Sequence, residues 1–442
     1  MRTHNWLTRS ADTVPDRLAI VAGGERLTFS QLELRAVQSA RRLFALGARA
    51  GERVGVVLEP SLEQVVLLHG LSKLGAVAVP LDPGLTDAEL DRRLDRAGTA
   101  VVVRDPTSVR AAPEAEAPLR THVDLEEVCC VLHTSGTAGD PKAVELTYGN
   151  HLWSALASAA RIGVDPLDRW LCCLPLHHIG GLAIVLRSAI YGTSVVLERF
   201  DAARVATVIE AEEVTLASLV ATTLARLLGA DAPLQRLRCA LLGGGPVPAE
   251  LIARALEAGV PVAPTYGLTE AASQVTTLSP GELRRRPGSA GTPLLPTEVR
   301  IEDGRILVRG PTVAAGAADR DGWLRTGDVG RVEEGHLYVL GRADDVVVSG
   351  GENVSPQHVE EALLAHGDVT DAGVTAREDP DWQQAVTAVV VLRDGAAVRE
   401  AELREFCRGR LAPHEVPKRI EFADRLPRDA QGKLQRRKLR DG

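Results

Sequence analysis

The sequence has 442 residues, more than one hydrophobic core usually organises, and its length indicates about three domain-sized units or two unequal ones. Hydrophobic residues make up 45% of it and charged residues 25%, which is typical of a globular protein and excludes a largely disordered chain. The formal net charge of −8 provides no broad positive field for a phosphate backbone, so we expect no nucleic-acid partner.

The cysteines and the apolar runs indicate the compartment. Six cysteines occur without a Cys-x-x-Cys pair or a zinc-type spacing, which predicts buried thiols in a reducing environment. No uninterrupted apolar run reaches the ~18 residues of a spanning helix, and the amino terminus lacks the apolar core of a signal peptide. We therefore expect a cytoplasmic protein with no membrane span. Whether it forms a homo-oligomer is left open.

In chain order, short β-rich runs alternate with amphipathic helical stretches up to about residue 340. Residues 52–60 predict a strand, residues 61–75 a helix and residues 76–83 a strand, and a strand and helix recur at 238–245 and 248–259. This alternation is typical of parallel sheets covered by helices, so the predicted fold class is α/β.

From about residue 300 onward the pattern changes twice. Around residues 300–340 short strands are joined by the hairpin signals Asp303-Gly304 and Glu334-Gly335, which predicts a β-rich subdomain. Residues 344–442 then predict a small mobile α+β domain, with helices at 356–366 and 400–411 and a strand at 386–392. The expected domains are therefore a large one at 1–343 and a small C-terminal one at 344–442.

A loop at 134–142 indicates a polyphosphate site. Its sequence is Thr-Ser-Gly-Thr-Ala-Gly-Asp-Pro-Lys, and we expect it to join an apolar strand to a helix. Glycine amides allow close backbone approach to a phosphate, and the lysine neutralises its charge. The loop lacks the Walker A pattern, and alone it would suit an ordinary turn.

The loop resembles the first signature of the adenylate-forming superfamily, which includes acyl-CoA synthetases, luciferases and peptide-synthetase adenylation domains. Matching stretches follow in the same order at 175–182, 243–248, 266–274, 322–330, 341–356 and 427–439. The usual loop has Thr at 138 and Gly at 143, where this chain has Ala138 and Ala143, which puts one hydroxyl contact to the phosphates in doubt. The resemblance implies activation of a carboxylic acid by ATP as an acyl-adenylate, followed by transfer to the thiol of CoA.

The resemblance also implies an ATP site built from several segments. Tyr266 would stack on adenine, Thr269 would bond the α-phosphate, and Asp328 would hold the ribose. Glu270 and Thr137 would bind Mg²⁺, which prefers oxygen ligands. The full ATP-binding set is Thr134, Ser135, Gly136, Thr137, Gly139, Lys142, Gly243, Gly244, Gly245, Tyr266, Gly267, Thr269, Asp328, Arg342 and Lys433.

Lys433 resembles the catalytic lysine of the superfamily, with Thr269 and His178 as the other implied catalytic residues. Attack of a carboxylate on the α-phosphorus brings two anions together, so an ammonium that bridges them lowers the barrier. Asp344 resembles the hinge about which the small domain rotates for thioester formation. The implied CoA-binding residues are Ser349, Gly350 and Gly351.

The acid itself is indicated by an apolar helical run that follows a histidine pair. Arg187 is the single charge in this run, and helical spacing places it on one face with Gly180 and Ala183. A buried charge needs an anion. The residues alone leave two alternatives open: a protein carboxylate, or a second carboxylate on the substrate.

The stretch 175–200, together with Ser273 and Gln274, resembles the 2-succinylbenzoate–CoA ligases of menaquinone biosynthesis, a branch of the same superfamily. Their substrate is an aromatic dicarboxylate, and the resemblance implies that its contacts are His177, His178, Arg187, Ser273 and Gln274. A medium- or long-chain acyl-CoA ligase and a stand-alone adenylation enzyme that loads a carrier-protein thiol remain alternatives. A nucleotide-binding regulator that has lost catalysis is the alternative from another class.

Overall fold

The computed structural model describes residues 1–134, 142–343, 345, 347–349, 352–379, 382–428 and 434–441, with the backbone alone at 348, 352, 353, 383, 437 and 441. The chain forms two compact units. Unit 1 consists of Met1–Gly245, Ala255–Val299 and Val308–Leu324, and unit 2 of Pro246–Arg254, Arg300–Leu307 and Arg325–Gly442. Each unit is described by itself.

The main sheet of unit 1 is parallel from β14 to β2, with antiparallel strands at both edges. Parallel neighbours need a crossover, and the helices between these strands supply it. In order across the sheet the strands are β16 (Thr292–Pro293), β15 (Ser273–Thr277), β14 (Val262–Leu268), β13 (Cys239–Leu242), β12 (Leu216–Leu219), β10 (Arg169–Cys172), β11 (Ser194–Leu197), β2 (Leu18–Ala22) and β3 (Glu25–Thr28).

A second sheet of unit 1 holds both ends of the predicted phosphate loop. Its order is β6 (Thr99–Val103), β4 (Arg53–Val57), β5 (Val77–Leu81), β8 (Val128–Thr134) and β9 (Lys142–Thr147). The loop was expected to lead from a strand into a helix, and this expectation was wrong: β9 follows the loop and pairs antiparallel with β8. The cause is the alternation after Lys142, in which Val144 and Leu146 are buried while Glu145 is exposed. A short pair, β1 (Arg2–His4) and β7 (His122–Asp124), lies apart from both sheets.

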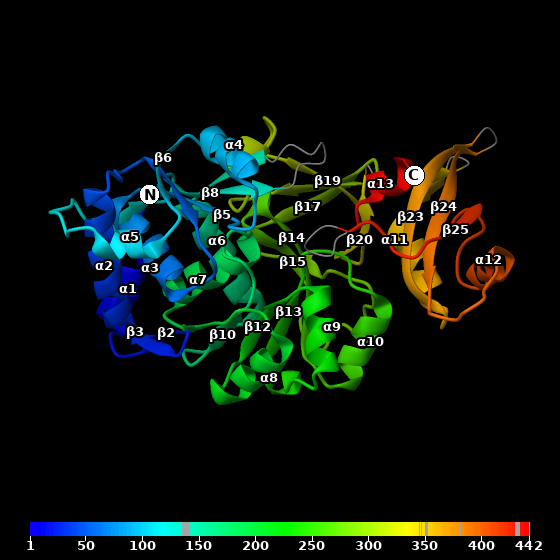
Figure 1. Cartoon of the computed structure of the whole chain (residues 1–442), viewed down its shortest axis with the longest axis horizontal. Helices are drawn as coiled ribbons and strands as arrows, with labels where there is room; N and C mark the ends of the chain where they lie inside the picture. Colours follow the sequence, from blue (N-terminus) through cyan, green and yellow to red (C-terminus); the bar gives the residue numbers. More distant parts are fainter. Residues whose placement is uncertain are drawn as a thin grey trace. The chain divides into compact units, whose positions relative to one another are not determined.

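Helices connect and cover these strands (Figure 1). They start and stop where the sequence offers caps: in α3, Ser61 accepts a hydrogen bond from the backbone of Gln64, and Gly75 ends the helix at φ +70°. They are α1 (Trp6–Thr13), α2 (Phe29–Ala45), α3 (Leu62–Leu74), α4 (Asp87–Ala97), α5 (Pro106–Ala111), α6 (Tyr148–Ile162), α7 (Ile179–Tyr191), α8 (Ala202–Ala211), α9 (Ala221–Gly229), α10 (Ala249–Glu257) and the 3₁₀ turns η1 (Leu234–Arg236), η2 (Thr269–Ala271) and η3 (Ala315–Ala317).

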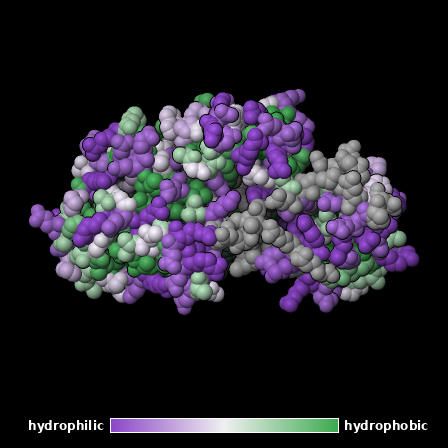
Figure 2. All heavy atoms as spheres, turned by 90° about the horizontal axis from the view of Figure 1, so that it is seen from above, coloured by the Kyte–Doolittle hydropathy of each residue, from purple (hydrophilic) through white to green (hydrophobic). Residues whose placement is uncertain are grey.

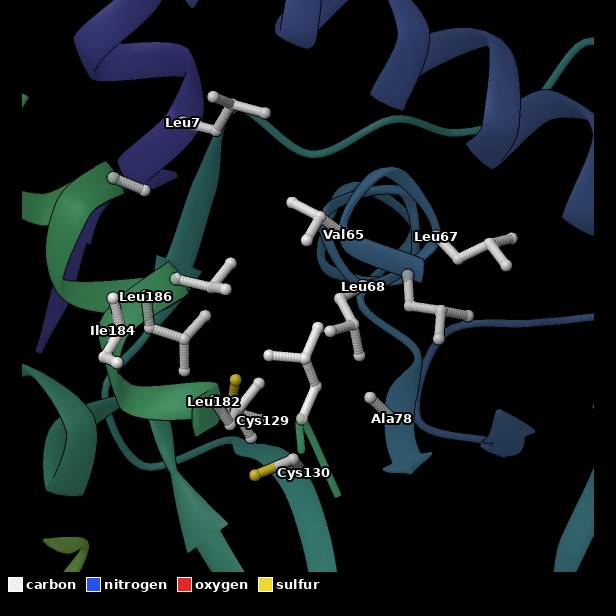
Figure 3. Close-up of a cluster of buried hydrophobic side chains, with 14 of the residues drawn as sticks. Leu7, Val65, Leu67, Leu68, Ala78, Cys129, Cys130, Leu182, Ile184 and Leu186 are labelled. Carbon is white, nitrogen blue, oxygen red and sulfur yellow. The ribbon is translucent and has the colours of Figure 1, made fainter. Parts of the chain in front are cut away.

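The core of unit 1 forms where α3, α7 and β8 meet. Figure 3 shows Leu68 of α3, Leu182 and Leu186 of α7, and the adjacent Cys129 and Cys130 of β8 in this cluster of buried side chains. All six cysteines are buried free thiols, as predicted from their spacing. Burial raises the pKa of Cys173 to about 12, which makes that thiol a poor nucleophile.

The predicted β-rich region forms a sheet with the order β17 (Glu298–Glu302), β18 (Arg305–Arg309), β19 (Leu324–Glu333) and β20 (His336–Arg342). Its hairpin turns lie where the sequence predicted them. Asp303 and Gly304 have φ values of +50° and +74°, and Glu334 and Gly335 have +48° and +79°, the left-handed conformations that tight hairpins require.

The C-terminal part of unit 2 is an α+β fold, as predicted. Its sheet contains β22 (Glu352–Val354), β21 (Val347–Ser349), β24 (Gln383–Leu392) and β23 (Val369–Asp379), and β25 (Arg419–Phe422) pairs in parallel with β24. Figure 1 shows the long β23–β24 hairpin beside α11 (Pro356–Leu364). The remaining helices are α12 (Glu400–Arg408) and α13 (Arg436–Asp441).

Among the described helices, none is both long and apolar enough to cross a bilayer. On the face shown in Figure 2, hydrophilic residues predominate and hydrophobic residues lie in small groups between them. The apolar residues of the composition are therefore gathered mainly in the cores.

Candidate functional site

The predicted adenine and α-phosphate residues lie on a tight turn between β14 and β15. Tyr266 and Gly267 end β14, and Thr269 and Glu270 form η2, whose last residue is followed by Ala272 with φ +50°. The backbone nitrogen of Ala314 donates to the carbonyl of Glu270 at 2.8 Å. The turn therefore presents a hydroxyl and a carboxylate side by side, both only partly buried.

The predicted glycine segment 243–245 follows β13, the neighbour of β14 in the sheet. A Cβ atom on Gly243 would lie 2.7 Å from Cγ2 of Thr265, so the two strand ends approach too closely for a side chain there. Gly244 has φ +84° and is exposed, as is Gly245. Ligands of parallel sheets bind beyond the carboxyl ends of the strands, where these glycines and Tyr266 lie.

Thr134 and Lys142 mark the two ends of the predicted phosphate loop and pair directly across the β8–β9 ladder. Thr134 is partly buried and Lys142 is exposed. The other predicted loop residues lie outside the described residues, as do the predicted catalytic lysine, the hinge and two CoA-binding glycines. They are Ser135, Gly136, Thr137, Gly139, Lys433, Asp344, Gly350 and Gly351.

The rings of His177 and His178 lie in contact at the start of α7, with centroids 4.4 Å apart and planes tilted by 60°. The turn that carries them is tight, because a Cβ atom on Gly181 would lie 2.4 Å from the carbonyl oxygen of Pro175. Burial, and next the neighbouring His178, lower the pKa of His177 to about 4, although Asp82 lies 3.9 Å from its Nε2 atom. His177 is therefore neutral at physiological pH.

Arg187 lies on the buried face of α7, as its spacing predicted, and its residue is only 3% exposed. Its Nη2 atom donates to Oγ of Ser154 at 2.9 Å, and its guanidinium carbon lies 5.8 Å from the centre of the Trp170 ring. In the described part of the chain, no acidic side chain forms an ion pair with it. Desolvation by burial lowers the pKa of Arg187, yet an arginine in a protein keeps its charge.

The predicted substrate residues Ser273 and Gln274 begin β15, directly after Ala272. Ser273 has φ +100°, and Gln274 is buried with its Nε2 atom donating to Oγ1 of Thr277 at 2.8 Å. Oε1 of Gln274 is buried without a hydrogen-bond partner among the described residues. Hydrogen bonds join Arg187 to Ser154 and Ser154 to the carbonyl of Ala272, so these residues and the β14–β15 turn lie in one region of unit 1.

Unit 2 holds the predicted ribose and nucleotide residues. Asp328 on β19 lies opposite Arg342 on β20, and Nη1 of Arg342 donates to Oδ1 of Asp328 at 3.0 Å. Gly327, with φ +76°, allows the bend before Asp328, and its carbonyl accepts from the backbone of Ala343 at 2.8 Å. The two side chains predicted for the nucleotide are therefore mutually positioned.

Ser349, predicted to contact CoA, is completely buried on β21, and its Oγ atom has no hydrogen-bond partner within the described ranges. Arg436, three residues after Lys433, is partly buried, with 13% of its side chain exposed. It pairs with Glu360 and donates to the carbonyl of Val374 at 3.1 Å. The basic residues that follow Lys433 in the sequence do not reveal which of them packs against a carboxylate.

Comparison with known proteins identifies the family. Residues 7–316 match the family described as AMP-binding enzyme, and residues 358–433 match the AMP-binding enzyme C-terminal domain. The chain belongs to the AMP-binding enzyme family. The predicted resemblance to adenylate-forming enzymes is thereby confirmed.

Within the AMP-binding enzymes the similarity extends over the whole chain. The chain is 42% identical to the 2-succinylbenzoate–CoA ligase of Geobacillus kaustophilus, over 99% of this chain and 97% of the relative. It is also similar to the solved o-succinylbenzoate CoA synthetase (MenE) of Bacillus subtilis in complex with the acyl-adenylate intermediate OSB-AMP, at a TM-score of 0.94 and 36% identity over 100% and 99% of the two chains. The same synthetase in complex with ATP and magnesium ion matches at a TM-score of 0.92 and 36% identity, over 99% and 100%. The predicted α/β fold is confirmed.

The residues present fit a magnesium ion such as the one in the similar synthetase complex. Glu270 is partly exposed on η2 and forms no ion pair with any described residue. No cluster of three or more acidic, histidine or cysteine side chains that could hold a metal ion occurs where the structure describes the chain. Mg²⁺ typically takes one or two carboxylates and completes its shell with water and substrate phosphates, so a single glutamate suits it.

Proposed function

We propose that the chain is an AMP-forming carboxylate–CoA ligase that converts 2-succinylbenzoate, ATP and CoA to 2-succinylbenzoyl-CoA, AMP and diphosphate. In the first step a carboxylate oxygen of the acid bonds to the α-phosphorus of ATP, and the bond to the leaving diphosphate breaks. In the second step the CoA sulfur bonds to the acyl carbon, and AMP leaves with the bonding electron pair. The thiol proton is released.

Arg187 is the observation that carries this proposal. The sequence left a protein carboxylate and a substrate carboxylate as its possible partners, and the described residues supply no protein carboxylate. An isolated buried charge is costly, and it is retained where a ligand compensates it. A dicarboxylic acid meets this need, because one carboxylate is activated while the other stays charged. The full-length similarity to 2-succinylbenzoate–CoA ligases supports this acid.

The other predicted residues have consistent proposed roles in unit 1. Thr269 would donate to the α-phosphate, and Mg²⁺ held by Glu270 and the phosphates would supply positive charge for the leaving diphosphate. Tyr266 would stack on adenine, with the backbone of 243–245 along its edge. His177 and His178 would line the acyl pocket at the start of α7.

In unit 2, Asp328 would accept hydrogen bonds from the ribose hydroxyls, with its carboxylate oriented by Arg342. Three assignments stay predictions: the mobile catalytic ammonium of Lys433, the hinge at Asp344, and the domain boundary between 343 and 344. The contact of CoA with Ser349, Gly350 and Gly351 also stays a prediction.

Replacement of the buried arginine tests the assignment of the acid. Arg187→Ala should raise the KM for 2-succinylbenzoate about a hundredfold in ATP–pyrophosphate exchange. The reason is that the second carboxylate of the bound acid loses the guanidinium that pairs with it. Two monocarboxylic analogues, each lacking one of the two carboxylates, serve as probes. The analogue without the recognised carboxylate should bind the variant and the parent enzyme equally.

Arg238→Ala is the matched control, because Nε of Arg238 donates to Oδ1 of Asp168 at 2.7 Å and so already has a protein carboxylate. This control should lower stability and leave the KM for the acid unchanged. An unchanged KM in Arg187→Ala would remove the proposed role of Arg187. A panel of fatty acids, with CoA and a carrier protein offered as thiol acceptors, separates the remaining alternatives within the family.

Location and assembly are part of the proposal. A cytoplasmic enzyme is supported by six unpaired thiols, and the absence of a nucleic-acid partner by the net charge of −8. A homo-oligomer would be detected by light scattering of the purified chain.

A further inference from the structure

Ser154 of α6, which no sequence pattern singled out, is hydrogen-bonded on both sides. It accepts from Nη2 of Arg187 at 2.9 Å and donates its hydroxyl proton to the carbonyl oxygen of Ala272 at 2.6 Å. Ser154 is 2% exposed and Ala272 is completely buried. A hydroxyl has one proton to donate and lone pairs to accept with, so this chain of bonds has one consistent direction.

The carbonyl at the end of this chain belongs to a strained turn. Ala272 and Ser273 have φ values of +50° and +100°, which residues with side chains seldom adopt. Such a conformation persists when the surrounding structure holds it. Two hydrogen bonds do so here: the backbone nitrogen of Ala272 donates to the carbonyl of Thr269 at 3.0 Å, and Ser154 donates to the carbonyl of Ala272. The same turn carries Glu270.

The surroundings of Arg187 leave Ser154 as its anchor. His151 lies on the same helix one turn before Ser154, and its pKa is lowered to about 3 by burial and next by the charge of Arg187, so it is neutral. Trp170 presents a ring face at 5.8 Å, and Tyr191 contributes an electrostatic interaction. The guanidinium donates a directed hydrogen bond to Ser154, and a charged donor makes such a bond stronger than a neutral one.

We propose that Ser154 is a positioning residue that aims the guanidinium of Arg187 at the second carboxylate of the acid and ties it to the turn of Thr269 and Glu270. This inference rests on the proposed function of Arg187. It explains how one buried hydroxyl can link recognition of the acid to the turn that would hold the nucleotide. Removal of the hydroxyl leaves Arg187 charged and buried but no longer directed.

A double-mutant cycle tests the inference with Ser154→Ala, Arg187→Ala and the double variant. The KM for 2-succinylbenzoate and the maximal rate are measured by ATP–pyrophosphate exchange. Ser154→Ala should raise this KM roughly tenfold, the effect of losing one hydrogen bond to a charged group. In the Arg187→Ala background, Ser154→Ala should raise it no further, because Ser154 acts through Arg187.

Ser10→Ala is the matched control, since Oγ of Ser10 donates to the carbonyl of Ala189 at 2.7 Å in an equally buried bond between α1 and α7. It should lower the melting temperature and leave the KM for the acid unchanged. An unchanged KM in Ser154→Ala beside a raised KM in Arg187→Ala would overturn this inference alone, and so would additive effects in the double variant. An unchanged KM in Arg187→Ala would overturn the proposed function and this inference with it.

Discussion

Gly267 shows at the scale of one residue why the β14–β15 turn needs a glycine. A Cβ atom built on it would lie 2.0 Å from the carbonyl oxygen of Ser273. That neighbour is backbone and cannot rotate away as a flexible side chain could. The glycine was predicted from the family resemblance as an ATP contact, and the geometry gives it a structural requirement that stands without any ligand.

Gly267→Ala should therefore destabilise the chain by about 3 kcal/mol, because the backbone of the turn must shift to admit a methyl group. Adenylation should fall with it, since Thr269 and Glu270 lie on the displaced turn. Gly245→Ala is the matched control for folding, because its Cβ atom would meet nothing within 4 Å. Urea unfolding of both variants measures the difference, and equal stability of the two would contradict the steric argument.

The sequence predicts the structural position of some residues and not of others. The burial of Arg187 follows from helical spacing, because one charge in an apolar helix falls on a definable face. Ser154 could not be found in this way: its partners, Arg187 and the carbonyl of Ala272, are 33 and 118 residues away along the chain. A serine in a helix rich in small residues carries no signal of either contact.

At the scale of elements, features set by adjacent residues were predictable from the sequence, and features set by distant residues were not. Helix ends were predictable, because caps such as Ser61 and Gly75 are written in adjacent residues. The strand β9 was mistaken for the start of a helix: the alternation of Val144, Glu145 and Leu146 is a short local signal, and the pairing with β8 that makes it a strand lies across a loop. The residues of α13 and their neighbours in the sequence likewise do not predict where this helix packs on the sheet of unit 2.

Arg436 anchors α13 within unit 2. Its Nη2 atom donates to Oε2 of Glu360 on α11 at 2.8 Å, and its Nε atom lies 3.5 Å from Oδ2 of Asp345. The backbone nitrogen of Val374 also donates to Oε1 of Glu360 at 2.6 Å, so α11, β23 and α13 meet at this pair. The side chains of Arg436 and Glu360 are only 13% and 12% exposed.

Arg436→Met should destabilise unit 2 by about 3 kcal/mol, because it leaves the largely buried carboxylate of Glu360 without its cation. Thermal unfolding of the full chain would show this as a transition displaced to lower temperature. Arg399→Ala is the control from the same unit: Arg399 pairs with Glu402 at the surface, where its side chain is 81% exposed, and its loss should leave the transition in place. A small effect of Arg436→Met would indicate that Glu360 is solvated or protonated instead.

At the scale of the whole molecule, buried histidines make stability depend on pH. Burial is the largest cause that lowers the pKa of each of four histidines in unit 1. The pKa falls from 6.5 to about 4 for His69, His133 and His177 and to about 3 for His151. Between these values and 6.5 the unfolded chain binds protons that the folded chain does not. The stabilisation is therefore fully present above pH 6.5 and is lost as the pH falls toward 4.

The free energy of unfolding should consequently decrease by several kcal/mol between pH 7 and pH 5, as measured by urea denaturation at each pH. His69→Leu removes one of the titrating groups, so the slope of this free energy between pH 5 and 6.5 should decrease by about 1.4 kcal/mol per pH unit. Leu71→Ala, at a buried position of the same helix, should lower the free energy equally at every pH and leave the slope intact, because it removes packing and no proton. His69→Leu could instead lower the free energy of unfolding equally at every pH, with no change of slope. His69 would then have to be protonated in the folded chain, which would contradict the effect of its burial and of the nearby cation of Lys73.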